Sequence, residues 1–210
     1  MTTEKLSNLI DNAAKIISIV FHPMLMHLYG MMIILSAPTL FGYLPFNVKK
    51  NLLFIVLVNN VLIPISLIPY YKFRDIIGSW SIEDRKERFI PLIITSIFYS
   101  VTAFLVYSFQ IPLFLKSYLI ASAFVVITVT LINFLLKVSI HSAGAGVLTA
   151  LVLILAFKTY SPLAVYMVSV ILTGGLVLTS RLKLNLHNPQ QVWVGFLTGF
   201  MGLIFIMLLM

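Results

Sequence analysis

The chain has 210 residues, of which 60% are hydrophobic and 10% are charged, and its mean hydropathy is +1.07. A soluble domain of this length does not have so apolar a composition, so we expect an integral membrane protein. The net charge of +8 comes from Lys and Arg residues scattered between apolar runs. This pattern is typical of helix ends that meet lipid headgroups, and it argues against the continuous basic patch of a nucleic-acid-binding protein.

Apolar runs long enough to cross a bilayer follow one another along the chain. We expect seven spans, at 15–38, 51–70, 89–109, 114–136, 142–157, 161–179 and 191–210. Because the fifth run is short, and because Pro23, Pro64 and Pro69 can bend or end the first two, six spans plus a tilted or re-entrant piece is the alternative. The expected fold class is therefore all-α: a polytopic membrane helical bundle of six to seven transmembrane helices. Residues 1–210 form a single integral membrane domain.

Two stretches outside the spans are polar. The N-terminal segment 1–14 holds charges of both signs and lacks the form of a cleavable signal peptide, so we expect it to remain in the protein. The charged loop 71–88 is too short to fold alone. His22 and His27 lie in the first expected span without matching carboxylates, and we interpret them as packing or interfacial residues.

Two shorter polar segments, 137–144 and 180–191, stand at the entrances of later apolar runs. Each contains a histidine, and such groups are expensive to hold near lipid. Counting membrane crossings puts both segments and the charged loop on the same side. We therefore expect one anion site at a membrane interface, enclosed by the starts of the third, fifth and seventh spans.

The segment 180–191 resembles the third signature of the type 2 phosphatidic acid phosphatase (PAP2) superfamily, which reads Ser-Arg-x5-His-x3-Asp. Here Ser180, Arg181 and His187 match, and Gln191 stands where the family has Asp. The segment 138–144 is similar to the second signature, Pro-Ser-Gly-His, with Ile140 in place of Gly. The first signature, Lys-x6-Arg-Pro, is only hinted at by residues 85–91. The resemblance covers mainly residues 137–199 and is to a divergent member.

The resemblance implies a metal-independent hydrolase acting on a lipid phosphate or lipid diphosphate through a phosphohistidine intermediate. His187 would attack phosphorus, His141 would protonate the leaving group, and Gln191 would orient His187. Guanidinium and hydroxyl donors would bind the phosphate, and the candidates are Arg181, Ser139, Arg88 and Arg85.

We expect no cofactor and no metal, because cysteine is absent and no carboxylate cluster accompanies the two histidines. The expected partners are the lipid phosphate or diphosphate substrate and the lipid bilayer, with no nucleic acid. We expect the cell inner membrane as the location. Ten of the 14 Lys and Arg residues lie on the motif side, but six of these belong to the proposed site segments. The remaining four Lys and Arg residues equal in number the four on the opposite side, so the positive-inside rule leaves the orientation open.

Gln191 is the main departure from the family pattern. A neutral amide accepts a hydrogen bond but does not stabilise a cationic imidazole as an ion pair. We therefore expect either reduced hydrolysis, or a carboxylate from Asp84 or Glu87 in the place of the missing Asp. The alternative functions are a non-hydrolytic phospholipid-binding or transport membrane protein, and a lipid phosphotransferase.

The candidate residues also have plainer interpretations. His187 would be an interfacial loop residue, and His141 a polar contact between helices. Arg181 would anchor a helix end by extending to the headgroups. Arg85 and Arg88 would belong to a solvated, salt-bridged loop.

Overall fold

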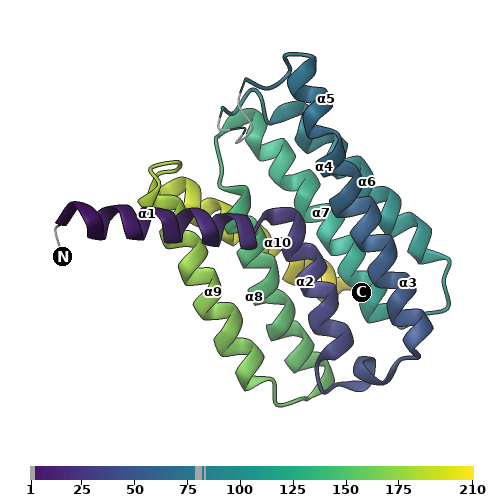
Figure 1. Ribbon diagram of the computed structural model, residues 1–210. Coiled ribbons are helices and arrows are strands. Elements are labelled where there is room, and N and C mark those ends of the chain that lie inside the picture. Colours follow the sequence, from purple (N-terminus) through teal and green to yellow (C-terminus); the bar gives the residue numbers. More distant parts are fainter. Residues whose placement is uncertain (1–2, 79–81, 83) are drawn as a thin grey trace.

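The computed structural model is an all-α bundle that describes residues 3–78, 82 and 84–210 (Figure 1). Within the described residues there is no strand, and six helical segments are long and apolar enough to cross a membrane. The expected all-α membrane fold is confirmed. The elements in chain order are α1 (Thr3–Val20), α2 (Pro23–Ser36), the 3-10 turn η1 (Leu40–Tyr43), α3 (Phe46–Leu57), the π-helical turn η2 (Val58–Leu62), α4 (Ile63–Ser66), α5 (Ile68–Phe73), α6 (Phe89–Tyr107), α7 (Leu113–Leu135), α8 (Ile140–Thr159), α9 (Ala164–Lys183) and α10 (Pro189–Leu209).

The first expected span, 15–38, is divided by a bend of 60° between α1 and α2. Pro23 stands in the first turn of α2, where its missing N–H costs nothing. The ring nitrogen Nδ1 of His22 accepts a hydrogen bond from the Met24 N–H at 3.4 Å and so caps α2. α1 therefore lies across one part of the bundle, whereas α2 runs along the other helices (Figure 1). If the bent pair counts as one span, the described residues hold seven spans.

α1 has the character of a helix that lies in a membrane interface. Its exposed apolar side chains include Leu9, Ile16 and Ile19, and the Asp11 carboxylate forms an ion pair with Lys183 on α9 at 3.3 Å. A helix with an apolar face and a charged face is stable at the boundary between headgroups and lipid tails. The polar N-terminal segment of the sequence is thus the beginning of an amphipathic helix.

The second span runs continuously from Phe46 to Phe73 through α3, η2, α4 and α5. The π-helical turn η2 precedes Pro64. Proline has no N–H to donate to the preceding turn, and a local π-helical turn accommodates this missing hydrogen bond. Asn60 in η2 accepts a hydrogen bond from Thr102 on α6 at 2.7 Å, which holds the distorted region in the bundle. The charged loop expected at 71–88 consequently begins after Phe73.

α8 is the central helix. A larger share of α8 is buried inside the bundle than of α6, α9 or α10. It is also full-length, ending at Thr159, so the expectation of a short fifth span was wrong. Glycines allow α10 to approach it closely: a Cβ at Gly195 would meet the carbonyl oxygen of Ser139, and a Cβ at Gly199 would meet that of Ala143. This packing fixes the start of α10 against the start of α8.

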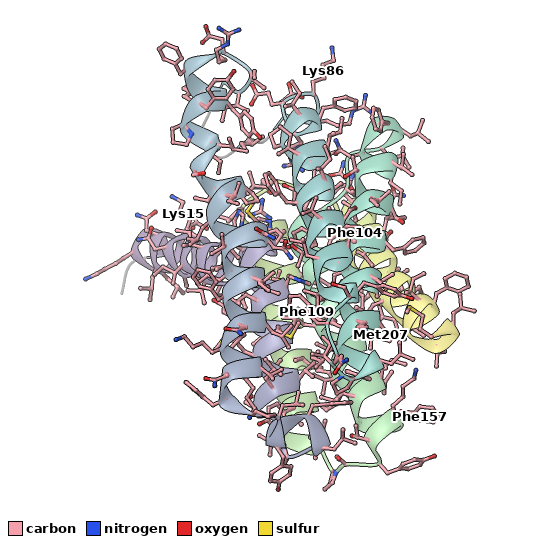
Figure 2. The ribbon with its side chains drawn as sticks, turned by 90° about the vertical axis from the view of Figure 1, so that its right-hand side faces the viewer. Lys15, Lys86, Phe104, Phe109, Phe157 and Met207 are labelled. Atoms are coloured by element: carbon pink, nitrogen blue, oxygen red, sulfur yellow. The ribbon has the colours of Figure 1, made fainter. Side chains whose placement is uncertain are left out.

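Large apolar side chains cover the outside of the bundle. Phe104 is 80% exposed and Phe157 is 65% exposed, and both point away from the helices in Figure 2. An exposed surface of this kind matches lipid tails. Lys86 and Phe157 lie toward opposite ends of the bundle (Figure 2), so the charged loop marks one membrane interface.

Candidate functional site

The predicted polar segments meet at a cavity of about 200 Å³ near the charged loop. Four predicted site residues line it: Arg88, His141, Arg181 and His187. Arg88, Arg181 and His187 are all buried, at 5–7% exposure. Two buried guanidinium groups beside imidazole rings give the cavity a positively charged wall, which fits an anionic group.

Backbone contacts hold the three segments together. The Arg88 Nη1 donates to the Val138 carbonyl at 3.4 Å, and its Nε donates to the Ile82 carbonyl at 2.8 Å. The Ser139 N–H donates to the Gln191 carbonyl at 3.1 Å. The charged loop and the starts of α8 and α10 therefore share one end of the bundle, as the count of crossings predicted.

The contact between His187 and Gln191 defines the state of the imidazole ring. The distance from His187 Nδ1 to Gln191 Oε1 is 3.0 Å. The same oxygen accepts a hydrogen bond from the Asn188 N–H at 3.3 Å, and the Asn188 Oδ1 accepts one from the Gln191 N–H at 2.9 Å, which completes a capping box. Because a backbone N–H only donates, the atom that faces it is the amide oxygen. Nδ1 of His187 is therefore the donor, and Nε2 keeps its lone pair.

His187 and Gln191 do not lie on one face of a helix, because α10 begins at Pro189 and His187 precedes the N-cap. The two side chains meet because the capping box turns the Gln191 side chain back toward the start of the helix.

The surroundings of His187 keep its ring neutral. Burial is the main cause that lowers the pKa of His187 to about 4. The positive charges of Arg88 and Arg181 act in the same direction, while the hydrogen bond to Gln191 opposes them. At pH 7 the imidazole is unprotonated at Nε2, as a nucleophile must be.

Ser18 on α1 contacts two predicted site residues. Its backbone carbonyl lies 3.2 Å from His141 Nε2, and its Oγ accepts a hydrogen bond from Arg181 Nη1 at 3.2 Å. Since a carbonyl only accepts, Nε2 of His141 carries a hydrogen and Nδ1 is left for another partner. Ser18 was not among the predicted site residues, because its only signal in the sequence is a lone hydroxyl within the apolar run 16–21.

His22 lies beside His141, with the two rings edge-to-face and their centroids 5.6 Å apart. Such a contact agrees with the packing role expected for His22. It also makes His22 part of the cavity wall, which the sequence did not indicate.

Two residues expected to bind phosphate are not among those that line the cavity. Ser139 is fully buried as the N-cap of α8, and its Oγ accepts hydrogen bonds from the Ser142 N–H at 3.3 Å and the Ser142 hydroxyl at 2.9 Å. Arg85 donates from Nη1 to the Leu135 carbonyl at 2.7 Å, at the end of α7 where a positive charge is favourable. The segment 84–88 forms turns instead of a helix, so Arg85 does not share a face with Arg88.

The carboxylates expected in the place of the missing Asp also lie elsewhere. Asp84 accepts a hydrogen bond from the Lys86 N–H at 3.0 Å, and neither Asp84 nor Glu87 lines the cavity. Gln191 is therefore the side chain that contacts Nδ1 of His187 within the described part of the chain.

The inner part of the cavity is apolar. Side chains from α2, α6, α7 and α8 surround it, among them Met26, Leu92, Val129 and Val147. Tyr71 on α5 also lines the cavity, and its hydroxyl has no hydrogen-bond partner among the described residues. The cavity thus combines a polar, cationic part with an apolar part.

In the described part of the chain, no group of three or more His, Cys, Asp or Glu side chains is placed to hold a metal ion. No protein-family model, curated protein or solved structure matches this chain.

Proposed function

We propose that this chain is a metal-independent phosphatase of lipid phosphates or lipid diphosphates, and a divergent member of the PAP2 superfamily. The observation that supports the proposal is the convergence of Arg88, His141, Arg181 and His187 on one cavity. These residues come from three segments far apart in the sequence. Interfacial loop residues without a common role have no reason to meet in one buried place.

In the first step, Nε2 of His187 attacks the phosphorus atom. A P–N bond forms and the bond from phosphorus to the lipid or phosphate oxygen breaks. When the anionic phosphate group occupies the cavity, its negative charge favours the imidazolium form of His141. That form gives its Nδ1 proton to the leaving oxygen, while its Nε2–H stays with the Ser18 carbonyl. The hydrogen bond from Nδ1 of His187 to Gln191 keeps the attacking nitrogen unprotonated.

In the second step, water attacks the phosphohistidine. Neutral His141 accepts a proton from the water, the P–N bond breaks, and inorganic phosphate leaves with His187 restored. Arg88 and Arg181 stabilise the charge on the phosphate oxygens throughout, since guanidinium offers fixed pairs of donors. The Tyr71 hydroxyl adds a further donor from the cavity wall.

The apolar part of the same cavity supports a lipid substrate. A phosphate group bound by the arginines would leave its hydrocarbon chain among side chains such as Met26 and Val129. We also propose the cell inner membrane as the location, because the described spans are helices and bacterial outer-membrane spans are strands.

The test is phosphate release by the purified protein from a lipid phosphate in detergent micelles. Wild type is expected to release phosphate, and His187→Ala and His141→Ala are each expected to lose at least 100-fold in kcat. Full activity of His187→Ala would contradict the proposal.

A protein that binds lipid phosphate without hydrolysing it is the second candidate. The neutral Gln191 favours it, because a phosphoimidazolium lacks an ion-pair partner there. Equilibrium binding of a lipid phosphate without phosphate release would support this candidate, and transfer of the phosphoryl group to another lipid would indicate a phosphotransferase.

A further inference from the structure

His27 is the most unusual polar residue of the apolar part of the cavity. Its side chain is 4% exposed, it lines the cavity, and neither ring nitrogen has a hydrogen-bond partner among the described residues. A neutral imidazole always carries one N–H donor. Leaving such a donor unsatisfied in an apolar interior is destabilising, so native proteins rarely contain one without a functional reason.

Two tyrosines hold the His27 ring in place. The ring stacks on Tyr118 with centroids 5.0 Å apart and an interplanar angle of 11°, and Tyr99 lies against it at 4.7 Å. The Tyr118 hydroxyl donates to the His27 backbone carbonyl at 2.8 Å, which fixes the same residue a second time. Because Tyr118 stacks on one face of the ring and Tyr99 lies against it, the ring is held where it lines the cavity. This arrangement pre-organises a donor in apolar surroundings.

The position of His27 along α2 gives its depth below the phosphate. His22 packs against His141, so it marks the level of the proposed phosphoryl transfer. His27 follows five residues later, and at about 1.5 Å per residue it lies about 7 Å further along the helix axis. A donor at this depth meets the part of the substrate that joins the phosphate to its hydrocarbon chains.

We propose that His27 is a specificity-determining residue that donates a hydrogen bond to an ester carbonyl of the lipid substrate. In a glycerolipid phosphate, five bonds separate phosphorus from the nearest ester carbonyl carbon, a distance of about 6 Å in an extended chain. That length agrees with the depth of His27. A polyprenyl phosphate has no acceptor at this position and would leave the donor unsatisfied. This inference rests on the proposed phosphate site, and it concerns recognition of the lipid and not the chemical step.

The experiment compares an ester-linked glycerolipid phosphate with its ether-linked analogue, which keeps the chains and lacks the carbonyls. Binding is measured with the His187→Ala protein in detergent micelles, so that no turnover is required. We expect the ester lipid to bind about tenfold more tightly, because the ether lipid leaves the His27 donor unpaired. His27→Phe, introduced into the same His187→Ala protein, keeps an aromatic ring against Tyr118 and should reduce the difference to less than about twofold.

Met26→Leu is the matched control, because Met26 lines the same cavity beside His27 and offers no hydrogen bond. It should preserve the preference for the ester lipid. Equal binding of the two lipids by the His187→Ala protein, or a preference that persists in His27→Phe, would overturn the inference. A preserved ester preference together with no phosphate release by wild type would refute the phosphatase and leave the recognition role of His27 standing. Binding of neither lipid would refute both.

Discussion

Replacing Gln191 with Glu should make this protein a faster phosphatase. The substitution keeps the side-chain length, so a carboxylate oxygen takes the position of Oε1, which lies 3.0 Å from Nδ1 of His187. A neutral hydrogen bond contributes about 0.5–1.5 kcal/mol and one to a charged group about 1.5–3 kcal/mol. The imidazolium-like ring of the transition state therefore gains about 1–1.5 kcal/mol. This gain corresponds to about tenfold in kcat and to about one unit in the pKa of His187.

The pH dependence of kcat/KM tests the same contact between His187 and residue 191. The nucleophile is the unprotonated ring, so activity falls as the pH drops through the pKa of free His187, which is about 4. In Gln191→Glu the carboxylate raises this pKa, and the loss of activity should begin about one pH unit higher. Wild type and variant act on the same substrate, so ionisation of the lipid phosphate affects both profiles equally.

Two variants separate orientation of His187 from capping of α10. Gln191→Leu removes the acceptor and should lower kcat about tenfold. Asn188→Ala removes the cap, at a cost of about 1 kcal/mol in stability, but keeps the partner of His187. Gln191→Asp restores the residue of the family signature with a side chain one carbon shorter, and a smaller gain than that of Gln191→Glu is expected. If none of the Gln191 variants changed kcat or the pH profile while His187→Ala abolished activity, Gln191 would not be the orienting partner.

Three further outcomes follow from the geometry. Arg88→Ala should lower kcat/KM about 100-fold, because Arg88 lines the cavity. Arg85→Ala loses only a contact with the Leu135 carbonyl and should change kcat/KM by less than about twofold, so similar losses for both variants would contradict this placement. Ser18→Ala should lower kcat/KM by about three- to tenfold, because Arg181 loses the hydroxyl that orients it. Unchanged kinetics would show that this contact does not support the site. EDTA should leave phosphate release intact, since His187 is the proposed nucleophile and the arginines stabilise the charge; loss of turnover with EDTA and its recovery with a divalent ion would refute the phosphohistidine scheme.

The sequence was sufficient to predict the bundle and the side on which its polar segments meet. Apolar runs of bilayer length report helices directly, and each crossing reverses the side, so the three segments had to share one end. The spacing of Arg181 and His187 likewise predicted residues that line the same cavity. These predictions succeeded because they depend on composition and on order along the chain.

The remaining features depend on side-chain directions that the sequence does not encode simply. Whether Arg85 or Arg88 enters the cavity depends on the turns of the charged loop, and only Arg88 does. Ser18 contacts the site because Pro23 helps to divide the first apolar run, which lets α1 cross over Arg181 and His141. The proposed role of His27 depends on its two tyrosine neighbours and on ring nitrogens without a hydrogen-bond partner among the described residues, and the sequence indicates neither.

The most direct test of the proposed chemistry is to look for the phosphoryl group on the protein. The protein is mixed with a lipid phosphate carrying labelled phosphorus, quenched in alkali during turnover because phosphohistidine survives base, and digested for mass spectrometry. The label is expected on the peptide that contains His187, and it should be absent from His187→Ala. Turnover by wild type with the label on another residue, or continued turnover by His187→Ala, would contradict His187 as the nucleophile.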